Sequence, residues 1–275
     1  MQLLKEWAGT AGWVKDLSFQ FRGMDVVGEK LRVEGRVESC AVRNGYGEIE
    51  CSLEIRNASG EVTTVGNGSV VLPLRGGAEV PYPYARFGDA NELVPELHRE
   101  LCPPQYERFL GLESDSLVTV EPIDASSVRR FAQAVMVQDR DYFDETGPGA
   151  QRFGSVVTPP LFPLHAFHDP ADAVDPLLAA LEDDEFDGAS QTPWAGFGLP
   201  ELPGAPKRIL NGGNRVQLFA YAPLGSRVDV ISRYEDIYQK QGSQGSLLFV
   251  SVCSQYSVHE TGQPLLSSLQ TLILR

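Results

Sequence analysis

The stretch FQFRGMDVVGEKLRVEGRV, residues 19–37, has a counterpart in VQLFAYAPLGSRVDVISRY, residues 216–234. Further along, SGEVTTVGNGSVVLPLR (59–75) matches TGQPLLSSLQTLILR (261–275), and both matches keep an offset of about 200 residues. Similarity that keeps its order over such a distance predicts the duplication of one sheet. The alternative is that two antiparallel meanders resemble each other by pattern alone.

Two segments of the first copy have the alternation of an antiparallel sheet with one face in water. Along residues 31–38 and 48–56, apolar residues alternate with charged ones, a period of two that is typical of β-strands. Asn44-Gly45, between the two segments, tolerates positive φ and predicts a hairpin turn. Residues 1–10, before this sheet, are predicted to be the end of a helix.

Two other regions have the composition of connecting segments. Residues 76–120 are interrupted by glycine and proline and are predicted to be a linker. Residues from about 168 to 207 are rich in Pro, Gly, Asp and Ala and are predicted to be an insertion. Between these regions, apolar residues at helical spacing predict an amphipathic helix over Val128–Met136, with Asp124 or Ser126 as its cap.

Composition limits the class of protein. The chain of 275 residues has 37 Asp and Glu against 23 Lys and Arg, which gives a formal net charge of −14. This excess argues against nucleic-acid binding, which needs clustered cations, and no apolar run is long enough for a membrane span. Cys40, Cys51, Cys102 and Cys253 lack metal-site spacing. We therefore expect reduced cysteines in a cytoplasmic protein with no metal, no cofactor, and no nucleic-acid or membrane partner.

Three stretches resemble a known family. ERFLGLESDSLVTVEPIDASSVRRFAQAVMVQDRDYFDE (107–145), followed by FGSVVTPPLFPLHAF (153–167), resembles the N-terminal, FAS1-like dehydratase module of MaoC-type double-hotdog proteins, the (R)-specific enoyl-CoA hydratase group. ILNGGNRVQLFAYAPLGSRVDVISRYEDIYQKQGSQGSLLFVSV (209–252) resembles the sheet that completes this module. The resemblance implies an α+β fold, a double hotdog in which antiparallel sheets wrap on central helices.

The resemblance also implies a division of the chain. Residues 1–75 would be the sheet half of a companion hotdog that is incomplete at its N-terminus, and residues 76–120 the linker. Residues 121–275 would be the MaoC N-terminal-type hotdog, with the insertion at about 168–207. Because an apolar sheet face is costly to expose to water, we expect a second hotdog subunit, identical or different, to cover the incomplete half.

The family adds water reversibly to trans-2-enoyl thioesters. Its Asp and His, spaced D-x4-H before the central helix, activate the water, and a backbone N–H near the helix start polarises the carbonyl. In VMVQDRDYFDE (135–145), Tyr142 stands where the His is expected, and the Asp position falls near Val137 or Gln138, beside Asp139. At the helix start the family has His-Gly, whereas this chain has Thr158-Pro159-Pro160, and proline carries no N–H.

These departures indicate the half of the family that lacks the dyad, with degenerate positions at Gln138, Asp139, Tyr142 and Pro160. Contacts to substrate are predicted on charge and turn character for Arg208, Asn211, Gly212 and Arg215, with Lys207 as a further cation.

The histidines offer no clear base. His165 is expected to be a core residue, and His98, His168 and His259 to be exposed or near turns without a nucleophile.

The expected function is that of a MaoC-like enoyl-thioester hydratase/dehydratase family protein that acts on or binds acyl-CoA, in fatty acid metabolism. Hydro-lyase activity would then require a partner or an upstream segment. The alternative is a non-catalytic acyl-binding or scaffold subunit of a heteromeric hydratase. A hotdog thioesterase would need a carboxylate beside the central helix, and PPLFPLH (159–165) has none.

Overall fold

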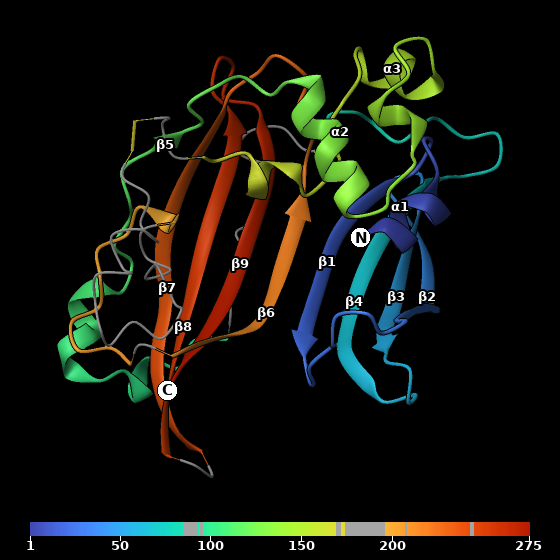
Figure 1. The fold of residues 1–275 in the computed structure, drawn as a ribbon. Helices are drawn as coiled ribbons and strands as arrows, with labels where there is room; N and C mark the ends of the chain where they lie inside the picture. The colour runs from blue at the N-terminus through green and yellow to red at the C-terminus, as the bar shows by residue number, and fades with distance from the viewer. Residues whose placement is uncertain (85–92, 94–95, 169–171, 174–195, 207, 243–244) are drawn as a thin grey trace.

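The computed structural model describes residues 1–84, 93, 96–168, 172–173, 196–206, 208–242 and 245–275. Within these residues one antiparallel sheet of nine strands dominates the structure, in the order β2-β3-β4-β1-β6-β9-β8-β7-β5 (Figure 1). The strands are β1 (Trp13–Phe21), β2 (Arg32–Arg43), β3 (Tyr46–Arg56), β4 (Val62–Pro73), β5 (Leu117–Val118), β6 (Ile209–Leu218), β7 (Val228–Gly242), β8 (Gly245–Val258) and β9 (Pro264–Leu274).

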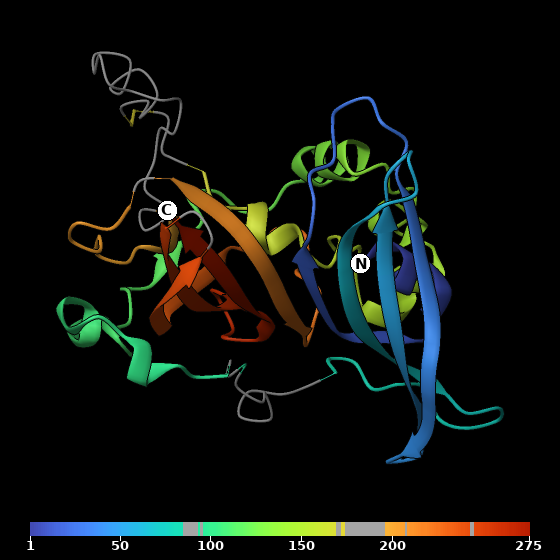
Figure 2. The same cartoon turned by 90° about the horizontal axis from the view of Figure 1, so that it is seen from below.

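The two halves of the sheet repeat one strand order. Outward from the centre, the first half runs β1-β4-β3-β2 and the second runs β6-β9-β8-β7. The two halves lie side by side in both views (Figure 1, Figure 2). This order agrees with the duplication predicted from sequence and does not follow from a general likeness of meanders. The Asn44-Gly45 turn also forms as predicted, with both residues at positive φ.

The halves meet at β1 and β6, which form the seam of the sheet. Their pairing runs from Asp16 opposite Gln217 to Phe19 opposite Asn214. Beyond the Asp16 end of this pairing, Trp13 is fully buried, and its indole N–H donates to the carbonyl of Leu218 across the seam at 3.1 Å. The Trp13 ring packs against an aromatic group that closes this end of the seam, made of Tyr82, Tyr84 and Tyr221.

Within the described residues, three short α-helices accompany the sheet. They are α1 (Gln2–Ala8), α2 (Ala125–Ala134) and α3 (Pro148–Phe153), and the 3-10 helices are η1 (Arg99–Leu101), η2 (Pro104–Phe109), η3 (Arg140–Tyr142) and η4 (Phe162–His165). The predicted helix end at residues 1–10 is α1, which packs on β1 and β4. No helix in the described ranges is both long and apolar enough to cross a membrane.

Two helix predictions were only partly correct. Asp124 caps α2, accepting from the N–H groups of Ser126 and Ser127, but the helix ends at Ala134, and Met136 lies beyond it at positive φ and is well exposed. The family resemblance places the start of the central helix at Thr158-Pro159-Pro160, whereas the described chain there forms only η4. A third proline at position 163 limits regular α-helical hydrogen bonding in this turn.

The predicted linker packs against the sheet. Tyr106 and Phe109 on η2 are buried with Tyr234 of β7 in a core on the second half. The predicted insertion at about 168–207 lies largely outside the described residues.

Candidate functional site

Three of the four predicted degenerate positions, Gln138, Asp139 and Tyr142, lie on the loop between α2 and α3. Asp139 caps η3 by accepting from the N–H of Asp141 at 3.0 Å. Asp141 and Tyr142 are buried, whereas Gln138 is exposed to solvent. The structure thus brings Asp139 and Tyr142 to one buried turn and leaves Gln138 outside it.

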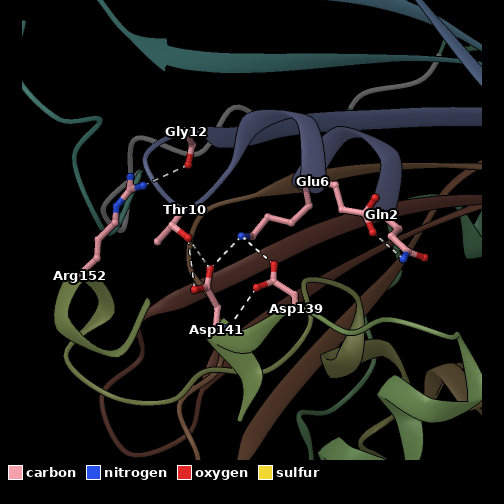
Figure 3. A network of polar contacts seen from close by, with 8 residues as sticks. Gln2, Glu6, Thr10, Gly12, Asp139, Asp141 and Arg152 are labelled. Atoms are coloured by element: carbon pink, nitrogen blue, oxygen red, sulfur yellow. Dashed lines mark hydrogen bonds and ion pairs between the residues drawn. The ribbon is translucent and has the colours of Figure 1, made fainter. Parts of the chain in front are cut away.

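A lysine from the other half of the chain contacts both carboxylates of this turn. The ammonium of Lys5 on α1 lies 3.1 Å from Asp139 Oδ2 and 3.0 Å from Asp141 Oδ2, with Lys5 only 5% and Asp141 only 4% exposed. The hydroxyl of Thr10 donates to both oxygens of Asp141, at 3.2 and 3.1 Å (Figure 3). Both carboxylates are therefore engaged in a contact between the first half and the loop of the second.

The position of the Asp141 side chain also depends on a glycine. A Cβ built at Gly149 in α3 would lie 2.3 Å from Asp141 Oδ1, a distance that no real contact allows. The backbone of α3 can approach the carboxylate this closely because Gly149 has no side chain.

Two tyrosines beside the carboxylates are strongly biased toward the neutral phenol. Burial raises the pKa of Tyr142 far above its ordinary value, and the nearby Tyr221, Asp139 and Asp141 raise it further. Burial similarly raises the pKa of Tyr221, and Tyr82 and Asp141 add to the effect. A neutral phenol can donate a proton in a hydrogen bond but is a poor base.

Arg152 of α3 lies near Tyr221, and its side chain binds backbone carbonyls. Its guanidinium donates to the carbonyls of Gly12 at 3.2 Å and Val80 at 3.0 Å, and burial lowers its pKa. Arg152 thereby joins α3 to both ends of the first half.

The segment expected to supply an oxyanion donor has no free N–H at three successive residues. The N–H of Thr158 donates to the carbonyl of Ala222 at 3.0 Å, and Pro159 and Pro160 carry none. Thr158 and Pro160 are both buried. A thioester carbonyl cannot find a backbone donor at these positions.

A cavity of about 670 Å³ lies beside the tyrosines. Its walls are mostly aromatic and apolar, including Tyr82, Phe153, Tyr221 and Val258, and Thr261 and Gln263 add polar atoms. The Tyr82 hydroxyl donates to the carbonyl of Tyr221 at 3.3 Å, so this wall is fixed by the backbone. The cavity suits an apolar chain with a few polar contacts.

A separate groove of about 1140 Å³ holds most of the predicted substrate contacts. Asn211, Gly212 and Arg215 line it together with Arg275, whereas Arg208 is exposed and does not. Lys207 lies outside the described residues. The structure thus groups three of the four predicted residues, on a surface distinct from the cavity.

The histidines differ from expectation in two places. His165 is exposed rather than part of the core. His98 is half-buried and pairs with the fully buried Asp236, its backbone N–H at 2.9 Å and its ring Nδ1 at 3.3 Å from Oδ2. Neither residue of this pair lines the cavity or the groove. His259 pairs with Asp229 on the surface.

Lys5 and Thr10 were missed by sequence reasoning. They lie more than 130 residues from Asp141, so no local spacing connects them. Among the described residues, no group of three His, Cys, Asp or Glu side chains is arranged to hold a metal ion.

Comparison with known proteins identifies the family. The model of the family described as "FAS1-like, dehydratase domain region" matches residues 108–265, more than half of the chain. The chain belongs to this family. No curated protein matches this FAS1-like dehydratase-region protein by sequence.

Solved structures show the fold of this family member. A putative MaoC domain dehydratase from Chloroflexus aurantiacus J-10-fl superposes with a TM-score of 0.58 at 10% identity, over 95% of this chain and 75% of that one. A MaoC-like dehydratase from Phytophthora capsici gives 0.52 at 12% identity, over 97% and 73%. A conserved hypothetical protein from Mycobacterium tuberculosis, described as having a double hotdog fold, gives 0.51 at 10% identity, over 95% and 74%. The predicted MaoC-like family and the α+β double-hotdog fold are confirmed.

We expect Lys5→Met to lower the free energy of unfolding by about 3–5 kcal/mol, because it leaves two carboxylates near a buried site without their cation. Urea denaturation of the single variants and of the double variant with Asp141→Asn measures the coupling, expected at about 1–3 kcal/mol. Lys15→Met is the matched control, since Lys15 makes a partly exposed pair with Glu48 and should cost less than about 1 kcal/mol. If the two single variants change the free energy of unfolding by amounts that simply add in the double variant, the contact between Lys5 and Asp141 is contradicted.

Stability should fall steeply in alkali and less steeply in Tyr142→Phe. A phenol in the unfolded chain titrates near pH 10, whereas burial raises the folded-state pKa of Tyr142 above that value and that of Tyr256 to about 12. The unfolded state therefore releases protons first, so stability present below about pH 10 is lost as the pH rises.

Removing the Tyr142 hydroxyl should reduce that loss by about 1.4 kcal/mol per pH unit between about pH 10 and 12. Urea denaturation at each pH measures it. The two proteins should have parallel stability profiles from about pH 6 to 8, where phenols do not titrate. If the free energy of unfolding falls with pH at the same rate in both proteins above about pH 10, Tyr142 is not buried.

Proposed function

We propose that this chain binds an acyl thioester as the half of a MaoC-like hydratase/dehydratase assembly that lacks the catalytic dyad. The observation that carries the proposal is the contact of Lys5 with Asp139 and Asp141. Both carboxylates at the degenerate site are committed to a buried ammonium. They are therefore poorly placed to take a proton from water.

The chemistry of hydration supports the same conclusion. Adding water to an enoyl thioester needs a base near neutral pKa and a donor to the thioester oxygen. Tyr142 is held as a neutral phenol by burial, which raises its pKa. The N–H of Thr158 is already bonded, and two prolines follow it. A histidine and a free amide supplied by another subunit would complete the chemistry.

The aromatic cavity at Tyr82, Phe153 and Tyr221 is the proposed place for the acyl chain. Its volume and apolar walls suit such a chain, and Tyr221 joins it to the degenerate turn. The groove with Arg215 and Arg275 carries positive charge and is proposed for a phosphate of the carrier. CoA is the carrier proposed first, and an acyl carrier protein is the alternative.

The purified chain alone is expected not to hydrate crotonyl-CoA, because no base and oxyanion donor face one another at the degenerate site. Loss of the enoyl-thioester absorbance measures the reaction, with a catalytic MaoC-type hydratase as the positive control. Turnover by this chain at the rate of the control would overturn the proposal. If activity arises only on adding a dyad-bearing hotdog protein, the chain is a subunit of the active assembly, and if it never arises, the chain is an acyl-binding subunit.

Thermal stabilisation by a long acyl-CoA tests binding independently of activity. Thr261→Trp narrows the exposed rim of the cavity and should reduce the shift in Tm produced by acyl-CoA by more than half. Gln133→Trp, on the exposed side of α2, is the matched control and should leave the shift intact. Arg215→Ala should weaken the shift given by CoA itself. If acyl-CoA shifts the Tm of Thr261→Trp as much as that of the original chain, the acyl chain does not bind in this cavity.

A further inference from the structure

No described residue pairs with the outer edge of β2, although its counterpart in the second half is covered. β2 ends the sheet on one side, and at the other end β5 pairs with β7, Leu117 opposite Val230 and Val118 opposite Asp229. In the sequence repeat β2 corresponds to β7, and Gly35 falls on Ser232. The repeat therefore marks the outer edge of β2 as a place where a strand belongs.

The repeat also indicates which backbone groups of β2 point outward. In β7, the carbonyl of Ser232 accepts from Ser114, and Tyr234 exchanges bonds with Gly111 and Leu112. Ser232 and Tyr234 correspond to Gly35 and Val37.

Val33, Gly35 and Val37 are thus expected to present their N–H and C=O groups at the edge. No described residue outside the β2–β3 pairing bonds to them. Such a row is a template for another strand.

The side chains beside this edge are exposed and apolar on one face. Val33 is 53% and Val37 46% exposed, and they share the face on which Leu3 of α1 approaches Gly35. Trp7, one helical turn beyond Leu3, is also half exposed. Burying this apolar surface would be favourable.

The sequence of the edge is complementary to itself. We propose that β2 pairs antiparallel with β2 of a second copy of this chain, about a twofold axis at Gly35. In the segment RVEGRVE (32–38), this register sets Glu34 opposite Arg36, Val33 opposite Val37 and Arg32 opposite Glu38. Each contact occurs twice, with charges on one face and valines on the other.

Neighbouring registers lack this complementarity. An axis at Glu34 sets Glu34 opposite itself and Arg32 opposite Arg36, and an axis at Arg36 sets Glu34 opposite Glu38. Like charges directly opposite are destabilising. Glu34 has Arg32 and Arg56 nearby within one chain, at 2.8 and 3.6 Å, whereas no ion pair is recorded for Arg36 among the described residues. Arg36 is therefore available to a second copy.

A charge-swap experiment tests both the partner and the register. Analytical ultracentrifugation of the full chain should show a concentration-dependent dimer. Glu34→Arg and Arg36→Glu should each raise the dimer dissociation constant by about tenfold or more, because each places two pairs of like charges together. An equimolar mixture of the two variants should restore the affinity, since opposite charges then face one another at all four positions.

The controls separate the edge from general charge effects. Arg36→Lys keeps the charge and should keep the dimer, and Arg75→Glu and Glu121→Arg make the same charge changes at exposed positions outside β2. Amide exchange at Val33 and Val37 should slow as the protein concentration rises. A monomer at all concentrations, a dimer that neither edge variant weakens, or a mixture that fails to recover would each overturn the proposal. A monomer would instead leave this edge to a strand of a different protein.

Discussion

The buried ammonium of Lys5 is the interaction on which the candidate site depends. It contacts two carboxylates from a loop more than 130 residues away, and all three groups are largely withdrawn from water. A buried charge left without its partner is costly, so α1 and η3 must be in place together. The contact connects the first half of the sheet to the module that covers the second. It also supports the proposed lack of a base at this site, because carboxylates that hold a cation are poorly placed to take a proton.

The strands could be predicted from the sequence because their period of two is local. The alternation along residues 31–38 and 48–56 gave β2 and β3, and the repeat anticipated the equal strand order of the two halves. The cap at Asp124 was foreseen because a side-chain acceptor before a helix is a short-range signal. The helix start implied at Pro159 does not form a regular α-helix there, since prolines fix where a helix can start but not whether it continues.

The site could be predicted only in part. The departures from the family pattern at Tyr142 and Pro160 are visible in one sequence compared with a known pattern, and their bearing on catalysis stays a prediction. The contacts of Lys5 and Thr10, and the pair formed by His98 and Asp236, depend on how distant segments pack, and no spacing encodes them. The groove could be predicted in part from sequence. Asn211 and Arg215 both line it because they lie close together along β6, whereas Arg208 does not line it.

The close approach of Gly149 to Asp141 has an evolutionary consequence. The carboxylate is enclosed by the ammonium of Lys5, the hydroxyl of Thr10 and a backbone that leaves no space for a methyl group. Loss of the ammonium alone would leave Asp141 enclosed without its cation, which is costly. Related chains that lack the lysine should therefore lack the aspartate as well, and the glycine should be free to vary only in those chains.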